Sequence, residues 1–301
     1  MKALIDAMFY RKYKHWGWSE TVFFVFAEII RKIQKKYVYS MTEKRCKSFL
    51  KKKDGECFFD FNGARLPDIT FDKKMQKMLN YVFEDIFLIS CYHNDNYDGK
   101  FVQEIDKVMN EGPYGYKEGM FDVTVHKDDI VIDAGAWIGD FSAYAASKKA
   151  LTYAFEPTKE TFDWLQKTAE LNNGYICPIP YGLGDSVEML SISTESPNSM
   201  VNSLLDDCVD GKEQVDMTTV DVFVKEHNLK RVDFIKSDIE GFERNLLRGA
   251  RETLKTFAPK LAICTYHLPD DPIVLAQIIK EANPDYKIVQ LRHKLFAAVC
   301  K

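Results

Sequence analysis

The sequence lacks the paired cysteines that mark zinc sites and disulfide frameworks. Its seven cysteines are scattered along 301 residues, and no two of them form a C-x-x-C pair. Metal ribbons and small disulfide-stapled domains both depend on closely spaced cysteines, so both classes are disfavoured. We therefore expect reduced cysteines, no cysteine-bound metal and a cytoplasmic location.

A long apolar run is also missing. The most apolar early stretch, Thr21–Ile30, includes Glu28 and is about half as long as the roughly 20 residues that a membrane-spanning helix needs. The first residues do not have the pattern of a secretory signal. With 46% apolar and 29% charged residues, the composition is typical of a soluble globular protein.

The net charge is small but unevenly distributed. The whole chain carries −4, yet residues 1–54 hold 14 lysines and arginines against 5 acids, a net charge of +9. Residues 3–53 also show helical spacing, which predicts an amphipathic, basic appendage packed on the main domain. Two alternatives are a dimerisation element and an interfacial membrane helix, the latter using Phe23, Phe24, Phe26, Arg31, Lys32, Lys35 and Lys36.

A polar, turn-rich stretch, Cys91–Gly99, marks the expected domain boundary. It follows a segment interrupted by glycine and proline, Asp54–Asp72, and a helical stretch, Lys73–Ile89. The sequence therefore predicts a helical, basic extension over residues 1–98 and an α/β domain over residues 99–301.

Short apolar runs alternate with helical segments from Phe121 onward, which favours a mostly parallel sheet covered on both faces. The expected strands are 130–134, 151–155, 176–181, 232–236, 261–266, 286–291 and 296–300, and the expected helices are 141–149, 159–172, 244–256 and 273–281. The last two strands are too close for a crossover helix, so they should form an antiparallel hairpin. An added strand pair is expected at 187–192 and 215–220.

A glycine turn, "VIDAGAWIGDFS", follows the first of these strands. The dinucleotide fingerprint G-x-G-x-x-G is absent, because Trp137 and Asp140 stand where it needs glycines. An acid inside such a turn repels phosphate and suits a cationic amino group. Glu156 ends the next strand 21 residues after Gly135, where a carboxylate can accept both hydroxyls of a ribose. A ribose and an amino group without phosphate indicate S-adenosylmethionine.

Four stretches of the sequence resemble the FkbM-type methyltransferases. They are "VIDAGAWIGDFS", "YAFEP", "VDFIKSDIEGFERNLLRGA", and "LAICTYHLPDD" with "YKIVQLRH". The resemblance implies a Rossmann-like class I sheet and methyl transfer to a hydroxyl of a sugar or another small-molecule or glycan acceptor. The turn residues expected to bind the cofactor are Asp133, Gly135, Ala136, Gly139, Phe141 and Ser142. Trp137, where the family commonly has a small polar residue, and the long basic extension depart from the family pattern.

The reacting groups should lie across from the turn, at the carboxyl ends of the central strands. Asp238 follows the fourth strand and His267 ends the fifth. Since a neutral histidine is a natural base for an alcohol, His267 is the predicted base, with Asp238 beside it or on the cofactor. Two alternatives stay open: a histidine that only ties loops together, and a divalent cation on Asp238 and Glu240, which is less favoured.

Two further side chains have predicted roles. Lys236, a charge inside the fourth strand, needs a partner, for which Asp133 and Asp238 are candidates. Asp185, after the third strand, is placed near the adenine amino group. Acceptor specificity is expected in the extension, in Ser193–Ser203 and around Tyr114–Tyr116.

Two other functions compete with O-methylation. A nucleic-acid or other N-methyltransferase is disfavoured because "SDIEG" replaces the [DNS]-P-P-[YFW] stretch of base N-methylating enzymes. The acidic body also suits a polyanionic partner poorly, so no nucleic acid is expected as a partner. A cofactor-binding scaffold without chemistry is disfavoured because the candidate acids and the histidine are all present.

Overall fold

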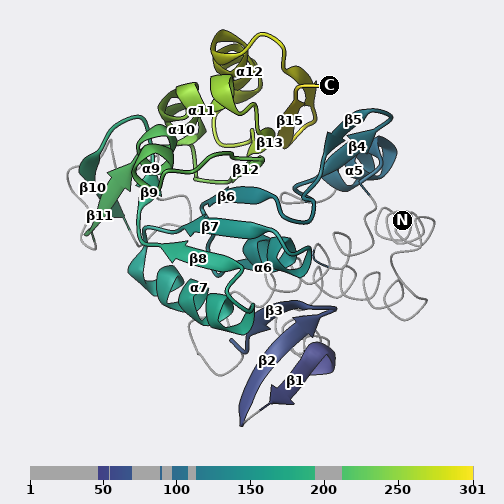
Figure 1. Ribbon diagram of the computed structural model, residues 1–301, viewed down its shortest axis with the longest axis vertical. Coiled ribbons are helices and arrows are strands. Elements are labelled where there is room, and N and C mark those ends of the chain that lie inside the picture. Colours follow the sequence, from purple (N-terminus) through teal and green to yellow (C-terminus); the bar gives the residue numbers. More distant parts are fainter. Residues whose placement is uncertain are drawn as a thin grey trace, which may run out of the picture.

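A seven-stranded sheet forms the centre of the computed structural model, which describes residues 47–53, 55–69, 89, 97–107, 113–193 and 212–300. The strand order is β14-β15-β13-β12-β6-β7-β8 (Figure 1). Its members are β6 (Ile130–Ala134), β7 (Leu151–Phe155), β8 (Ile176–Ile179), β12 (Phe234–Ser237), β13 (Lys260–Cys264), β14 (Lys287–Gln290) and β15 (Lys294–Ala298). The first five of these run parallel, and β15 pairs antiparallel with both β13 and β14. The mostly parallel sheet and the antiparallel hairpin are confirmed.

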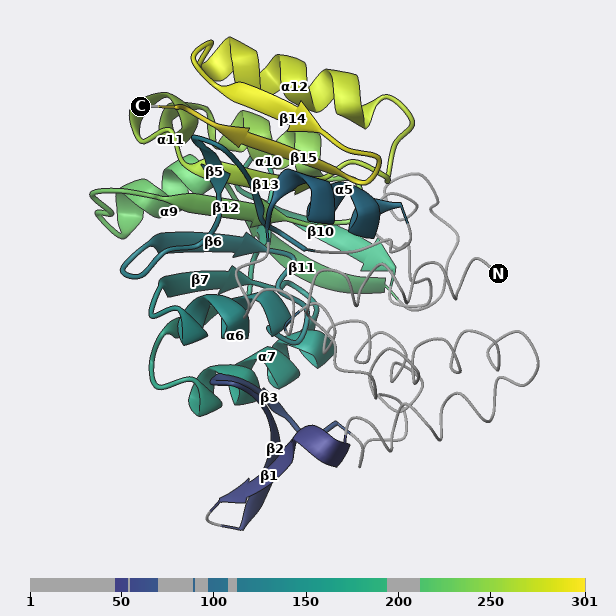
Figure 2. The ribbon, with the colours of Figure 1, turned by 90° about the vertical axis from the view of Figure 1, so that its right-hand side faces the viewer.

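Helices cover both faces of this sheet, which is why its strands are apolar on both sides (Figure 2). Val131 and Ile132 are both fully buried, although they point to opposite faces. The Val131 face packs against α5 (Gly99–Asp106), α6 (Asp140–Ser147) and α7 (Lys159–Leu171). The Ile132 face packs against α9 (Val220–Glu226), α10 (Glu243–Gly249), α11 (Arg251–Thr256) and α12 (Asp271–Ala282).

Two small sheets flank the large one. The expected added pair is present as β10 (Glu188–Ser193) and β11 (Lys212–Thr218), which are antiparallel. The two-residue strand β9 (Gly182–Leu183) pairs parallel with β11, and α9 follows β11 directly; neither was predicted. A further pair, β4 (Tyr116–Glu118) and β5 (Phe121–Val123), lies beside β13 and β15.

The described part of the extension is not helical throughout. After a short 3-10 helix, η1 (Lys47–Phe49), the chain forms an antiparallel sheet of β1 (Leu50–Lys53), β2 (Glu56–Phe61) and β3 (Ala64–Pro67). The prediction of helices is therefore wrong for residues 50–53, which form β1. Phe59, Phe61 and Leu66 are buried in the same core as residues of α6, because β2 and β3 carry an apolar face that only packing on the main domain removes from water.

The extension is also joined to α7 by hydrogen bonds. The Arg65 amide donates to Asn172 Oδ1 (3.2 Å), and Asn172 Nδ2 donates to the Arg65 carbonyl (2.7 Å). The described part of the extension is therefore packed on the main domain, and the boundary at residue 98 stays a prediction. The candidate interfacial residues from Phe23 to Lys36, most of the Lys73–Ile89 helix and most of Ser193–Ser203 lie outside the described residues. Among the helices that are described, none is long and apolar enough to cross a membrane.

Candidate functional site

The glycine turn opens at the carboxyl edge of the sheet, between β6 and α6. Gly135 (φ +71°) and Gly139 (φ +90°) both adopt left-handed backbone conformations, which favours glycine at these positions. A Cβ at Gly135 would also overlap the carbonyl oxygen of Asp238, which follows β12. Between them, Trp137 has φ +49°, a strained value for a bulky residue. The turn is therefore held tightly against the end of β12.

Glu156 joins the turn to the loop after β7. Its Oε2 accepts a hydrogen bond from the Trp137 amide (3.0 Å), and its Oε1 accepts from the Thr158 amide (3.0 Å) and the Thr161 hydroxyl (2.8 Å). Burial raises the pKa of Glu156, although these hydrogen bonds act in the opposite direction. Since Oε2 accepts one bond, it keeps a second acceptor position. The predicted proximity of Glu156 and the turn is present.

Several residues predicted to bind a cofactor are buried beneath the turn instead. Asp133 and Ser142 are fully buried and paired, with Ser142 Oγ donating to Asp133 Oδ2 (2.6 Å). The side chains of Ala136 and Phe141 are also fully buried. These four side chains therefore support the turn in this structure and do not line its surface. Asp185, by contrast, is exposed just after β9.

A buried ion pair crosses from β6 to β12. Lys236 and Asp133 occupy paired positions of the two parallel strands, and Lys236 Nζ lies 3.1 Å from Asp133 Oδ1. Lys236 Nζ also donates to the carbonyl oxygen of Gly135 (2.7 Å). The predicted partner Asp133 is therefore confirmed: it neutralises a buried lysine beneath the turn, and its contact with the cofactor stays a prediction.

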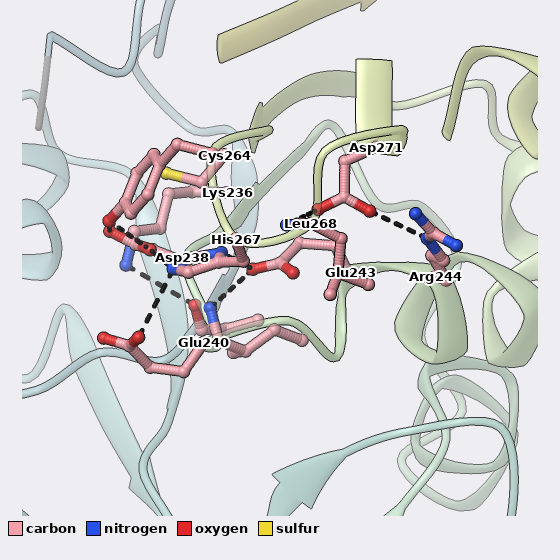
Figure 3. A network of polar contacts seen from close by, with 12 residues as sticks. Lys236, Asp238, Glu240, Glu243, Arg244, Cys264, His267, Leu268 and Asp271 are labelled. Atoms are coloured by element: carbon pink, nitrogen blue, oxygen red, sulfur yellow. Dashed lines mark hydrogen bonds and ion pairs between the residues drawn. The ribbon is translucent and has the colours of Figure 1, made fainter. Parts of the chain in front are cut away.

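His267 lies among three carboxylates beyond the ends of β12 and β13 (Figure 3). Its Nε2 is 3.4 Å from Glu240 Oε2 and 3.6 Å from Asp238 Oδ1, and its Nδ1 is 3.2 Å from Glu243 Oε1. Within the described part of the chain, neither ring nitrogen has a partner in hydrogen-bond geometry. The predicted pair Asp238 and His267 is thus brought together, with two glutamates beside it.

The surrounding carboxylates set the charge of His267. Burial alone would lower the pKa of His267, but polar contacts with Glu240 and Glu243 and the negative charges of Glu243 and Asp238 raise it to about 10. Burial would raise the pKa of Asp238, but the positive charges of Lys236, His267 and Lys294 hold it below the ordinary value. At neutral pH the pair is therefore a cationic imidazole beside an ionised carboxylate. The predicted neutral base does not fit these surroundings.

Two tyrosines complete the surroundings of Asp238. Tyr114 donates its hydroxyl proton to Asp238 Oδ2 (2.6 Å), and the Tyr266 hydroxyl lies 3.1 Å from Asp238 Oδ1. The Tyr114 ring also lies 4.4 Å from the ammonium of Lys294, which is 2% exposed. The sequence predicted acceptor specificity around Tyr114–Tyr116 but did not connect Tyr114 with Asp238. No local pattern could connect it with Asp238, since 124 residues separate them.

Glu243 is the second residue that sequence reasoning missed. It is fully buried at the start of α10, and its Oε1 accepts a hydrogen bond from the Ile239 amide (2.9 Å). Asp271, at the start of α12, holds the neighbouring loop by accepting from the Leu268 amide (2.9 Å) and from Arg244 Nε (2.7 Å). These bonds fix the loop that carries His267 against the helix that carries Glu243.

Comparisons with known proteins identify the family to which the chain belongs. Residues 133–287, about half of the chain, match the model of the methyltransferase FkbM domain. The chain is 28% identical to the hexuronic acid methyltransferase AglP of Haloferax volcanii over 55% of this chain and 67% of AglP. It is 33% identical to Methyltransferase 1 of Beauveria bassiana over 43% of this chain and 61% of that protein. The matches thus span about two thirds of the length of these curated relatives.

A solved FkbM methyltransferase structure from Methylobacillus flagellatus KT aligns over 77% of this chain and 61% of that chain, with 21% identity and a TM-score of 0.47. The fold and the family match together define an enzyme of the methyltransferase class. Within that class, the chain belongs to the FkbM methyltransferase family. The methyl donor that this membership implies is S-adenosylmethionine.

Proposed function

We propose that this enzyme methylates a hydroxyl of a sugar acceptor, with hexuronic acids as the first class to test. One observation carries the proposal: Gly135 of the donor turn packs directly on the backbone of Asp238, beside the polar cluster of His267. The proposed donor and acceptor sites are therefore adjacent, with Asp238 between them. Transfer of a small group requires such proximity. The name of AglP, a hexuronic acid methyltransferase, supports a sugar acid as the acceptor.

The residues around the turn fit the methyl donor. The carboxylate of Glu156 is an acceptor-only group at a strand end, which suits the two hydroxyls of a ribose. Asp140 begins α6, and its burial and the charge of Asp133, opposed by Lys236, raise its pKa to about 6. Asp140 is thus a second acid near the turn, besides Asp133, that suits the cationic amino group of the donor. When bound, S-adenosylmethionine supplies a methyl group on a positively charged sulfur.

Replacing Glu156 by alanine is expected to weaken donor binding by roughly ten- to a hundredfold, because charge-assisted hydrogen bonds worth about 1.5–3 kcal/mol are lost. Isothermal titration calorimetry with S-adenosylhomocysteine measures the change. Glu160→Ala, four residues further along the chain in the first turn of α7 and exposed, is the matched control and should bind like the parent. Unchanged affinity in a folded Glu156→Ala protein would show that the ribose is held elsewhere.

On the acceptor side, the chain offers a polar surface beside an aromatic ring. Tyr266 is 36% exposed and its ring centroid lies 4.2 Å from that of His267, with the two rings tilted by 44°. The apolar face of a sugar ring can pack on such a surface. Glu240 is 40% exposed and can accept from a sugar hydroxyl. Because the neighbouring carboxylates raise the pKa of His267, we assign it to balancing their charge, as a cation or as a metal ligand, and not to taking up the proton.

A methyl-acceptance screen tests the proposed acceptor. The chain is incubated with methyl-labelled donor and with free and nucleotide-linked hexuronic acids, the matching hexoses, single-stranded RNA and a lysine-rich peptide. Label is expected on the hexuronic acids, in an alkali-stable ether. Label on RNA or peptide alone would overturn the proposal. Equally efficient labelling of hexoses would show that the enzyme does not select for the carboxylate of a hexuronic acid.

A further inference from the structure

Several polar atoms of the cluster around His267 are buried and make no hydrogen bond to another described residue. Both nitrogens of His267 and Oε2 of Glu243 are buried and lack a hydrogen-bond partner among the described residues. The side chain of His267 is only 7% exposed and that of Glu243 is fully buried. Because buried polar atoms are nearly always satisfied, this group of atoms calls for a ligand between them.

The distances in the cluster are those between ligands of one metal ion. One atom each of Asp238, Glu243 and His267 lies within 4.8 Å of the others. A cation held at about 2.0–2.2 Å by nitrogen and oxygen places neighbouring tetrahedral ligands about 3.4 Å apart. The distance from His267 Nδ1 to Glu243 Oε1 is 3.2 Å and that from Nε2 to Asp238 Oδ1 is 3.6 Å. Because an imidazole binds one ion through one nitrogen, only one of these two separations is a distance between ligands, and each of them is close to the expected 3.4 Å.

The charges favour a divalent cation. Asp238, Glu240 and Glu243 bring three carboxylates to the imidazole. Two lysines act electrostatically on Asp238, but Lys236 is already paired with Asp133, which leaves only Lys294. With a neutral imidazole, the cluster therefore carries a charge close to −2. A divalent cation balances that charge, whereas a single proton on the imidazole does not.

We propose that Asp238, Glu243 and His267 form a binding site for a divalent cation. The set of one imidazole and two carboxylates suits Mn²⁺ or Zn²⁺, since imidazole favours the later transition metals and carboxylates the harder ions. Glu240, the most exposed of the four side chains, lies 3.4 Å from His267 Nε2 and marks the side that faces solvent. There the ion would hold an oxygen of the acceptor, a role that rests on the proposed function.

Binding is measured on the full chain, stripped with chelator, without donor or acceptor. Titration calorimetry with MnCl₂ and with ZnCl₂ is expected to show one site per chain. His267→Ala and Glu243→Gln should each weaken that binding by at least about tenfold. His126→Ala is the matched control, because His126 Nε2 also lies 3.6 Å from a carboxylate, that of Asp122, before the amino end of β6. It should bind like the parent.

Pulsed electron paramagnetic resonance of Mn²⁺ bound to the parent chain needs no variant and should show coupling to one imidazole nitrogen. An absence of binding at millimolar metal, or bound Mn²⁺ without nitrogen coupling, would overturn the site and leave a protonated histidine among carboxylates. Neither readout involves the acceptor. If metal binds but hexuronic acids accept no methyl group, only the proposed function fails.

Discussion

Replacing His267 by alanine is expected to lower the turnover of methyl transfer by roughly 10²–10⁴-fold, with little change in donor affinity. The substitution leaves Asp238, Glu240 and Glu243 without the cationic or metal-binding group between them. The negative charges of the three carboxylates are then less well balanced beside the proposed position of the acceptor oxygen. Turnover is measured with saturating donor and acceptor, and donor affinity is measured separately by calorimetry.

The control for this experiment is again His126→Ala, whose ring is exposed beside Asp122 and should not affect turnover. Circular dichroism establishes that both variants are folded. If His267→Ala turns over at nearly the parent rate, the histidine only fixes the loop between β13 and α12. The low exposure of its ring would then have a purely structural cause.

Replacing Asp133 by asparagine is expected to lower the free energy of unfolding by about 3–5 kcal/mol, because it leaves the ammonium of Lys236 buried without its counter-charge. The two side chains are 0% and 4% exposed, and Lys236 Nζ also donates to the backbone carbonyls of Ala134 and Gly135. Urea denaturation monitored by fluorescence gives the change. The double variant Asp133→Asn/Lys236→Met should recover much of the loss, since it removes the unpaired charge as well.

Asp163→Asn is the matched control for the same chemical change in an exposed pair. Asp163 lies 3.3 Å from Lys159 on the surface of α7, where the two side chains are 52% and 79% exposed. Its substitution should change the stability by less than about 1 kcal/mol. Equal losses for Asp133→Asn and Asp163→Asn would mean that the buried pair contributes no more than a surface pair.

The sheet could be predicted well because its strands are buried on both faces and separated by helices of clear periodicity. The runs at 130–134 and 151–155 coincide with β6 and β7. The β-rich part of the extension was missed because lysines at helical spacing also fit β1, a strand with an exposed face. Helix α9 was missed since its sequence, VDVFVKE, is rich in β-branched residues.

The site was predictable where a position in the motif determines a position in the fold. Glu156 and Asp238 follow strands, so their place at the carboxyl edge follows from the topology alone. The state of His267 did not follow, because it depends on Glu243, which approaches from another element, and on the summed charge of the cluster. Of the two acids named as candidate partners of Lys236, sequence spacing alone could not show that Asp133 forms the ion pair.

The position of β15 has a consequence for how the protein is made. This strand is synthesised after all the others of the sheet, yet it lies between β14 and β13. Its residues Leu295, Phe296 and Ala297 are fully buried. During synthesis, the edge of β13 that pairs with β15 therefore stays without its strand partner until residues 294–298 leave the ribosome. Lys294, which acts on Asp238, arrives with that strand, so the site acquires its full set of charges only at this last step.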